Sequence, residues 1–149
     1  MSMFHSMNTT SSALTAQRLR MDVISSNMAN VDSTRGKLVN GEWQPYTRKE
    51  VVMQPQEKNF SSFLNTAMNA GSAGSGVRVS EIREDQTPFK LVFDPSHPDA
   101  NEAGYVQMPN VDPLREMVDL ISATRSYEAN VTVFNASKSM MMKALEIGK

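Results

Sequence analysis

The sequence predicts an α+β protein in which two long helices, one from each end of the chain, enclose a small β-rich module. Three observations predict it: apolar residues at heptad spacing near the N-terminus, a long stretch without a helix breaker near the C-terminus, and short β-type segments between prolines. We therefore assign residues 1–35 and 110–149 to a helical, coiled-coil-like domain. Residues 36–109 are assigned to an inserted β-rich module.

The first helix is predicted over residues 4–30. Met7, Leu14, Met21 and Met28 recur every seven residues, and Ile24 falls on the same face. Polar residues interrupt this apolar stripe at several positions, so the coiled-coil pattern is incomplete. The stripe still predicts one face that packs against other helices.

Two asparagines lie near the predicted end of this helix. Asn is a middling helix former, so Asn27 and Asn30 suggest side chains that bond backbone groups where the chain leaves the helix. The plainer interpretation is a simple C-terminal cap.

The middle of the chain has a different pattern. Residues 51–53, 77–82 and 89–93 are rich in β-branched and aromatic side chains, with prolines between them, and are predicted strands. Residues 60–68 are compatible with a short helix. Residues 69–76 are almost entirely Gly, Ser and Ala, which predicts a flexible segment.

The last helix is predicted from Pro113 to a stop at Gly148. Asp112 is a good N-cap, and proline is favoured at the first helical position. Apolar or weakly polar residues then follow at spacings of three or four, with one gap at Ser137: Leu114, Val118, Ile121, Thr124, Tyr127, Val131, Phe134, Met141 and Leu145. Such a helix would be roughly 50 Å long. A compact chain of 149 residues cannot cover it, so its stripe needs a partner. The residues thus predict a polymerising or helix-pairing protein.

Composition argues against several other classes of protein. The chain has 15 Lys and Arg against 16 Asp and Glu, and this balance lacks the basic excess expected of a nucleic-acid surface or a polybasic membrane anchor. No apolar run approaches the roughly 20 residues that span a bilayer. The first ten residues have neither a basic nor an apolar signal-peptide region, so we expect no cleaved secretory signal. With no cysteine, the chain cannot form disulfides.

Catalytic and metal-binding patterns are equally scarce. The segment from Asp94 to Asp99 places two carboxylates around His97, but its two prolines favour a structural turn over a metal site. The last helix also carries a charged group, which is interpreted as a solvated face or as inter-subunit salt bridges: Glu116, Asp119, Arg125 and Glu128. No phosphate-binding loop or nucleophile motif is present. We therefore predict no enzyme activity, no cofactor and no bound metal.

Two regions at the ends of the chain carry a recognisable pattern. The first is residues 13–33, with the core Val-Ile-Ser-Ser-Asn-Met-Ala-Asn at residues 23–30. This stretch resembles the N-terminal signature of the flagellar rod and hook proteins, and its core matches that family position by position. Residues 92–100, 104–112 and 126–130 resemble the proximal rod members. The resemblance is weakest over residues 36–75.

The resemblance implies a structural subunit of the flagellar basal-body rod, which polymerises into a helical tube and transmits torque. It implies passage through the flagellar type III export apparatus without a cleaved signal, and a location outside the cytoplasm. The implied partners are further copies of the chain, the rod proteins FlgB, FlgF and FlgG, and the adaptor FliE. Carried over by position, the implied interface residues are Met7, Leu14, Met21, Ile24, Asn27, Met28, Asn30, Leu114, Val118, Ile121, Tyr127, Val131, Phe134, Met141 and Leu145.

The alternative function is a cytoplasmic helix-pairing adaptor or export chaperone. Such a protein would use the same apolar stripes to bind a partner without polymerising. An unrelated adaptor would lack the family signature at both ends of the chain, so we favour the rod subunit.

Overall fold

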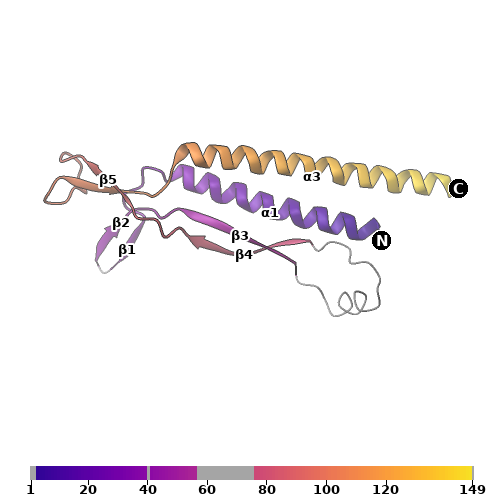
Figure 1. Ribbon diagram of the computed structural model, residues 1–149, viewed down its shortest axis with the longest axis horizontal. Helices are drawn as coiled ribbons and strands as arrows, with labels where there is room; N and C mark the ends of the chain where they lie inside the picture. The colour runs from indigo at the N-terminus through magenta and orange to yellow at the C-terminus, as the bar shows by residue number, and fades with distance from the viewer. Residues whose placement is uncertain (1–2, 40, 57–75, 149) are drawn as a thin grey trace. The chain divides into compact units, whose positions relative to one another are not determined.

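The computed structural model describes residues 3–39, 41–56 and 76–148. It shows two long helices, and the short strands come between these helices in the sequence (Figure 1). This confirms the predicted α+β class. Neither long helix has a stretch apolar enough to cross a membrane within these residues. The elements in chain order are α1 (Met3–Ala29), β1 (Lys37–Val39), β2 (Glu42–Gln44), β3 (Lys49–Pro55), β4 (Val77–Glu84), β5 (Lys90–Phe93), β6 (Tyr105–Met108) and α3 (Pro113–Ile147).

Within the described residues, the strands form three separate pairs. β1 and β2 are antiparallel, with Leu38 opposite Trp43, and β5 and β6 are antiparallel, with Phe93 opposite Tyr105. β3 pairs with β4. At one end of this third pair the Gln56 amide donates to the Gly76 carbonyl, and at the other the Asp85 amide donates to the Arg48 carbonyl. Because the later residue of one strand pairs with the earlier residue of the other, β3 and β4 are antiparallel too.

The three predicted strands are confirmed as parts of β3, β4 and β5. The prediction missed β1, β2 and β6, which have three or four residues each. The short helix suggested for residues 60–68 and the flexible segment at 69–75 lie outside the described residues. The division into a terminal helical domain and an inserted module stays a prediction.

The chain divides into two compact units. The first comprises Met1–Leu19, Val52–Glu81 and Ala123–Lys149, and the second comprises Arg20–Val51 and Ile82–Ser122. Each unit therefore combines part of α1, part of α3 and part of the β3–β4 pair.

The first unit buries small side chains. Those buried among its described residues are Thr10, Ala16, Ala123 and Ser137. At Gly76 the chain runs so close to α1 that an added Cβ would lie 2.6 Å from the Ser12 hydroxyl oxygen. That hydroxyl accepts a hydrogen bond from the Val77 amide at 3.1 Å. Small residues thus permit close approach of the backbones in this unit.

The second unit has a mixed core. Its buried aliphatic side chains are Val23, Ile24, Val106 and Val111. Beside them the unit buries four polar or charged side chains, Asn27, Arg48, Asn110 and Glu116. Buried polar groups are costly unless they are hydrogen-bonded, so their partners define how this unit is held together.

Candidate functional site

The implied interface residues of α1 are mostly turned away from solvent. Met7, Leu14, Met21 and Met28 are half-buried, and Ile24 is buried. Their stripe therefore contributes to packing within the chain. Their role at a subunit interface stays a prediction.

The implied interface residues of α3 fall on two different faces. Leu114, Val118 and Ile121 are 71%, 68% and 62% exposed. Further along the helix Tyr127, Val131, Phe134 and Met141 are half-buried, while Leu145 at its end is exposed.

The spacing of the sequence pattern explains this division. From Val118 the pattern advances to Ile121, Thr124 and Tyr127 in three successive steps of three residues. Each step falls about 60° short of a full turn, so three steps carry the pattern about halfway round the helix. We call the exposed side chains at the start of the helix the α3 apolar face: Leu114, Met117, Val118 and Ile121.

Asn27 connects α1 to β3 through a fully hydrogen-bonded amide. Its nitrogen donates to the Lys49 carbonyl at 2.9 Å and to Glu116 Oε2 at 3.1 Å. Its oxygen accepts from the Lys49 amide and from the Tyr46 hydroxyl, both at 3.0 Å. Both donors and both acceptor positions are thus satisfied, as burial of an amide requires.

Asn30 acts at the helix exit itself. Its side-chain nitrogen donates to the Ser26 carbonyl at 2.8 Å, and its oxygen accepts from the Ser33 hydroxyl at 3.2 Å. The prediction that these asparagines bond backbone groups where the chain leaves the helix is confirmed for Asn30. Asn27 instead bonds the backbone of β3 at Lys49.

Glu116 lies at the centre of a buried polar cluster. Its side chain is fully buried, and Oε1 accepts a hydrogen bond from Arg48 Nε at 2.6 Å. The Arg48 guanidinium also donates to Glu50, lies 3.3 Å from Asp85 Oδ2, and lies 3.8 Å from Asp119 Oδ2. We define the buried polar cluster as Asn27, Arg48, Glu50, Asp85, Asn110, Glu116 and Asp119.

Further bonds extend this cluster to neighbouring segments. Asn110 accepts from the Arg48 amide at 2.8 Å and donates to the Asp85 and Thr87 carbonyls. Asp119 also accepts from Arg20 of α1 at 3.0 Å. The cluster therefore joins segments from α1, β3, the end of β4 and α3.

Charge pairing in the cluster shifts the pKa of Arg48. Burial by itself would lower the pKa, but hydrogen bonds and charge attraction from Glu116 and Glu50 outweigh it, so the pKa is raised. The guanidinium stays charged and neutralises part of the surrounding acidic charge.

The prediction of a solvated face is confirmed for Arg125 and Glu128, which are exposed and pair with each other, but it is wrong for Glu116. Asp119 is about a third exposed. Glu116 is buried, and both it and Asp119 pair within the chain.

Glu116 lies seven residues before the buried Ala123 and therefore shares its helix face, but the sequence alone does not show that Ala123 is buried. Arg48 and Asn110 carry no local signal either, because their partners are distant in the sequence.

The segment around His97 forms the structural turn that its prolines favoured. Asp94 accepts hydrogen bonds from the Ser96 amide and hydroxyl, and His97 Nδ1 accepts from the Asp99 amide at 3.1 Å. Asp99 in turn binds Arg35 Nε at 2.8 Å, and hydrogen bonds from Arg35 and then Thr34 lower its pKa. Over residues 3–39, 41–56 and 76–148, no group of three or more His, Asp or Glu side chains is placed to hold a metal ion.

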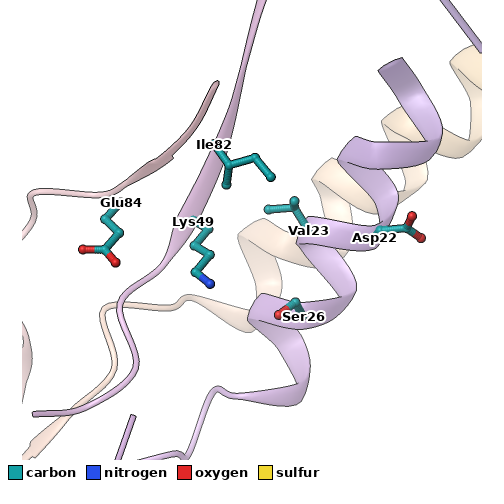
Figure 2. A pocket seen from close by; sticks show the side chains of 6 residues that line it. All are labelled: Asp22, Val23, Ser26, Lys49, Ile82 and Glu84. Carbon is teal, nitrogen blue, oxygen red and sulfur yellow. The ribbon is translucent and has the colours of Figure 1, made fainter. Parts of the chain in front are cut away.

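One groove opens on the second unit, between α1 and the β3–β4 pair. Figure 2 shows Val23 and Ile82 facing one another across it, with Lys49 beside them and Asp22 and Glu84 at its two sides. The groove has a volume of about 470 Å³. Its lining consists of Asp22, Val23, Ser26, Lys49, Ile82 and Glu84. This mixture of apolar floor and charged sides suits contact with another protein surface.

Comparison with known proteins gives consistent matches at both ends and over the full length. The family "Flagella basal body rod protein" matches residues 7–36, and "Flagellar basal body rod FlgEFG protein C-terminal" matches residues 102–147. The flagellar basal-body rod protein FlgC of Bacillus subtilis is 65% identical over 150 residues, covering 100% of both chains. FlgC of Borreliella burgdorferi is 46% identical, covering 99% of this chain and 98% of its own. FlgC of Salmonella typhimurium is 46% identical, covering 93% and 92%. Because these similarities extend over essentially the whole chain, this protein belongs to the FlgC family of flagellar basal-body rod proteins.

Proposed function

We propose that this chain is a structural subunit of the bacterial flagellar basal-body rod and that it joins its neighbours through the α3 apolar face. The full-length similarity to FlgC rod proteins carries the first statement. The second rests on four large apolar side chains that gather on one exposed helix face. Exposed apolar side chains that are contiguous, rather than scattered singly, mark interaction surfaces.

The two long helices suit a subunit that transmits mechanical force. Contacts between identical subunits that do not close on themselves generate helical filaments, and a tube is one such assembly. The 35 residues of α3 give each subunit one long element along which several neighbours can make contact. We infer that seams packed in this way transmit torque along the rod.

The inferred partners follow the family. They are further copies of this chain, the rod proteins FlgB, FlgF and FlgG, the adaptor FliE, and the flagellar export apparatus through which the chain leaves the cytoplasm. The relatives are named as rod proteins, which fits a role without catalysis. The proposal accordingly assigns no reaction, cofactor or metal to the chain.

Replacement of Ile121 by Asp tests the assembly surface. Because Ile121 is exposed, we expect the free energy of unfolding of the purified chain to change by less than about 0.5 kcal/mol. In the rod, the carboxylate introduced by Ile121→Asp would be buried between subunits without a partner. Cells that carry only Ile121→Asp should therefore lack rods and motility.

Two variants on the same helix control this experiment. Val133→Asp makes the same kind of change at an exposed residue outside the α3 apolar face and should retain assembly. Ala123→Asp introduces the charge at a fully buried residue and should prevent folding. Normal rods in Ile121→Asp cells would show that the α3 apolar face does not form a contact between subunits. Recovery of the wild-type chain only in cytoplasmic complexes, never in purified basal bodies, would favour an adaptor or chaperone instead.

A further inference from the structure

The groove of the second unit has an apolar floor and an excess of negative charge. Val23 is buried at its base, and Ile82 faces it while still about half exposed. The side chains of Asp22 and Glu84 make no hydrogen bond or ion pair among the described residues, and both residues are exposed. Lys49 contributes the single positive charge of the lining, and its ammonium lies 5.7 Å from the centre of the Tyr46 ring. Two carboxylates against one ammonium leave the groove with a net charge of −1.

The start of α3 combines exposed apolar side chains with a positive charge. Leu114 and Val118 project from the α3 apolar face into solvent. Arg115 lies between them in the sequence and is exposed, and its side chain has no hydrogen bond or ion pair within the described part of the chain. We call Leu114 and Val118 the α3 ridge. This apolar ridge, with the unpaired guanidinium of Arg115 beside it, matches an apolar groove that has unpaired carboxylates at its sides.

We propose that the groove of one copy receives the start of α3 from a second copy of this chain. Leu114 and Val118 pack over Val23 and Ile82, and Arg115 pairs with Glu84 or Asp22. This inference rests on the proposed function, because it names one of the contacts through which rod subunits join.

The proposed contact also explains how one chain can form an open assembly. The groove and the ridge consist of different residues, so each copy offers both halves of the contact at once. Such a head-to-tail contact leaves one free groove and one free ridge after every addition. It therefore extends a filament and does not stop at a pair.

Cysteine cross-linking tests the contact directly, because the chain contains no cysteine of its own. Two differently tagged copies, one with Ile82→Cys and one with Val118→Cys, would be expressed in the same cells, and basal bodies would be purified and mildly oxidised. We expect a disulfide-linked species that carries both tags. Since each copy has only one cysteine, this species can form only between two chains.

Matched pairs of variants define the outcomes. Leu91→Cys replaces Val118→Cys in the control, because Leu91 is similarly exposed but lies on β5, and it should give at least tenfold less cross-linked product. Equal product from the control pair, or no doubly tagged product although both copies are present in the basal bodies, would overturn the proposal. A product that joins Ile82→Cys to a protein of another size would overturn the assignment of a second copy. Failure of the wild-type chain to appear in basal bodies would instead contradict the proposed function.

Exchange of charges tests the ion pair at the edge of the contact. Arg115→Glu and Glu84→Arg should each lower the doubly tagged product about tenfold, because each places like charges together. The two changes combined in one chain restore opposite charges and should recover most of the product. Both side chains are exposed, so circular dichroism of the purified variants should match wild type. A double variant no better than the single variants would exclude pairing between these two residues.

Discussion

At the scale of single residues, the second unit depends on polar side chains whose bonds reach across the sequence. Asn27 and Glu116 are separated by 89 positions and bond at 3.1 Å, while Arg48 bonds Glu116 from a third segment. A buried ion pair contributes little net stability compared with apolar packing, but removal of one partner is strongly destabilising. We infer that the buried polar cluster fixes which segments meet and in which register.

Glu116→Gln should lower the free energy of unfolding by about 3 kcal/mol. The amide of the glutamine has one oxygen for Arg48, and its nitrogen then faces the Asn27 nitrogen, so two donors oppose each other. Urea titration of the purified chain measures the change. Glu128→Gln on the same helix is the control, because its pair with Arg125 is exposed and should contribute less than about 0.5 kcal/mol. Equal effects of the two variants would contradict the central role of Glu116.

Asp85→Asn should alter how stability depends on pH. The hydrogen bond from the Thr87 amide, reinforced by Arg48, holds the pKa of Asp85 below its ordinary value of about 3.9. A carboxyl group whose pKa is lowered by folding stabilises the folded chain above the unfolded pKa, and this stabilisation is lost as the pH falls through the folded pKa. The variant should therefore be less stable than wild type at pH 7, with a difference that shrinks below about pH 4. Urea titrations at several pH values check this, and a constant difference would contradict it.

The sequence identified only some of these residues. Asn27 and Asn30 were recognisable because asparagine is unusual inside a helix, and the structure gives both of them backbone partners. Arg48 looked like any surface arginine. Its burial depends on carboxylates from β4 and α3, and no local pattern reports a contact over such distances in the sequence.

At the scale of elements, the sequence predicts that the long helices exist, but it does not predict which face of α3 is exposed. Pro113 at the start of α3 and the long run without a breaker predicted its full length. The apolar spacing, however, predicts a single stripe, whereas three consecutive three-residue steps divide it between an exposed and a half-buried face. The short strands β1, β2 and β6 were missed because they depend on their partners more than on their own side-chain pattern.

Gly104→Ala should destabilise the β5–β6 pair more than Gly41→Ala destabilises the β1–β2 pair. Both glycines have positive φ, 78° and 89°, which disfavours any residue with a Cβ. At Gly104 the added Cβ would also lie 3.0 Å from the Phe93 ring, whereas at Gly41 it meets nothing within 4 Å. We expect costs of about 2 and about 1 kcal/mol, respectively, by urea titration. Equal costs would show that the Phe93 ring moves aside freely.

At the scale of the whole molecule, many large apolar side chains lie on the surface and few lie in the core. The buried side chains of the first unit are small, and much of the core of the second unit is polar. Meanwhile the α3 apolar face and the outer surfaces of two strand pairs, with Trp43, Leu91 and Phe93, remain exposed. Apolar surface that stays outside the monomer is available to stabilise an assembly, which accords with a subunit of a polymer.

The excised middle of the chain tests whether residues 36–109 form a module of their own. In the whole chain Lys49 exchanges two hydrogen bonds with Asn27, and Arg48 is paired with Glu116, so excision removes partners on both terminal helices. The fragment would then expose or leave unpaired the groups that the second unit buries, and its three two-stranded pairs are each marginal alone. We expect a fragment of residues 36–109 to give poorly dispersed amide resonances and no cooperative urea transition, whereas the full chain under the same conditions shows both dispersion and a transition. A fragment that unfolds cooperatively would instead establish an independent β-rich domain and would show that the buried polar cluster only attaches the helices to it.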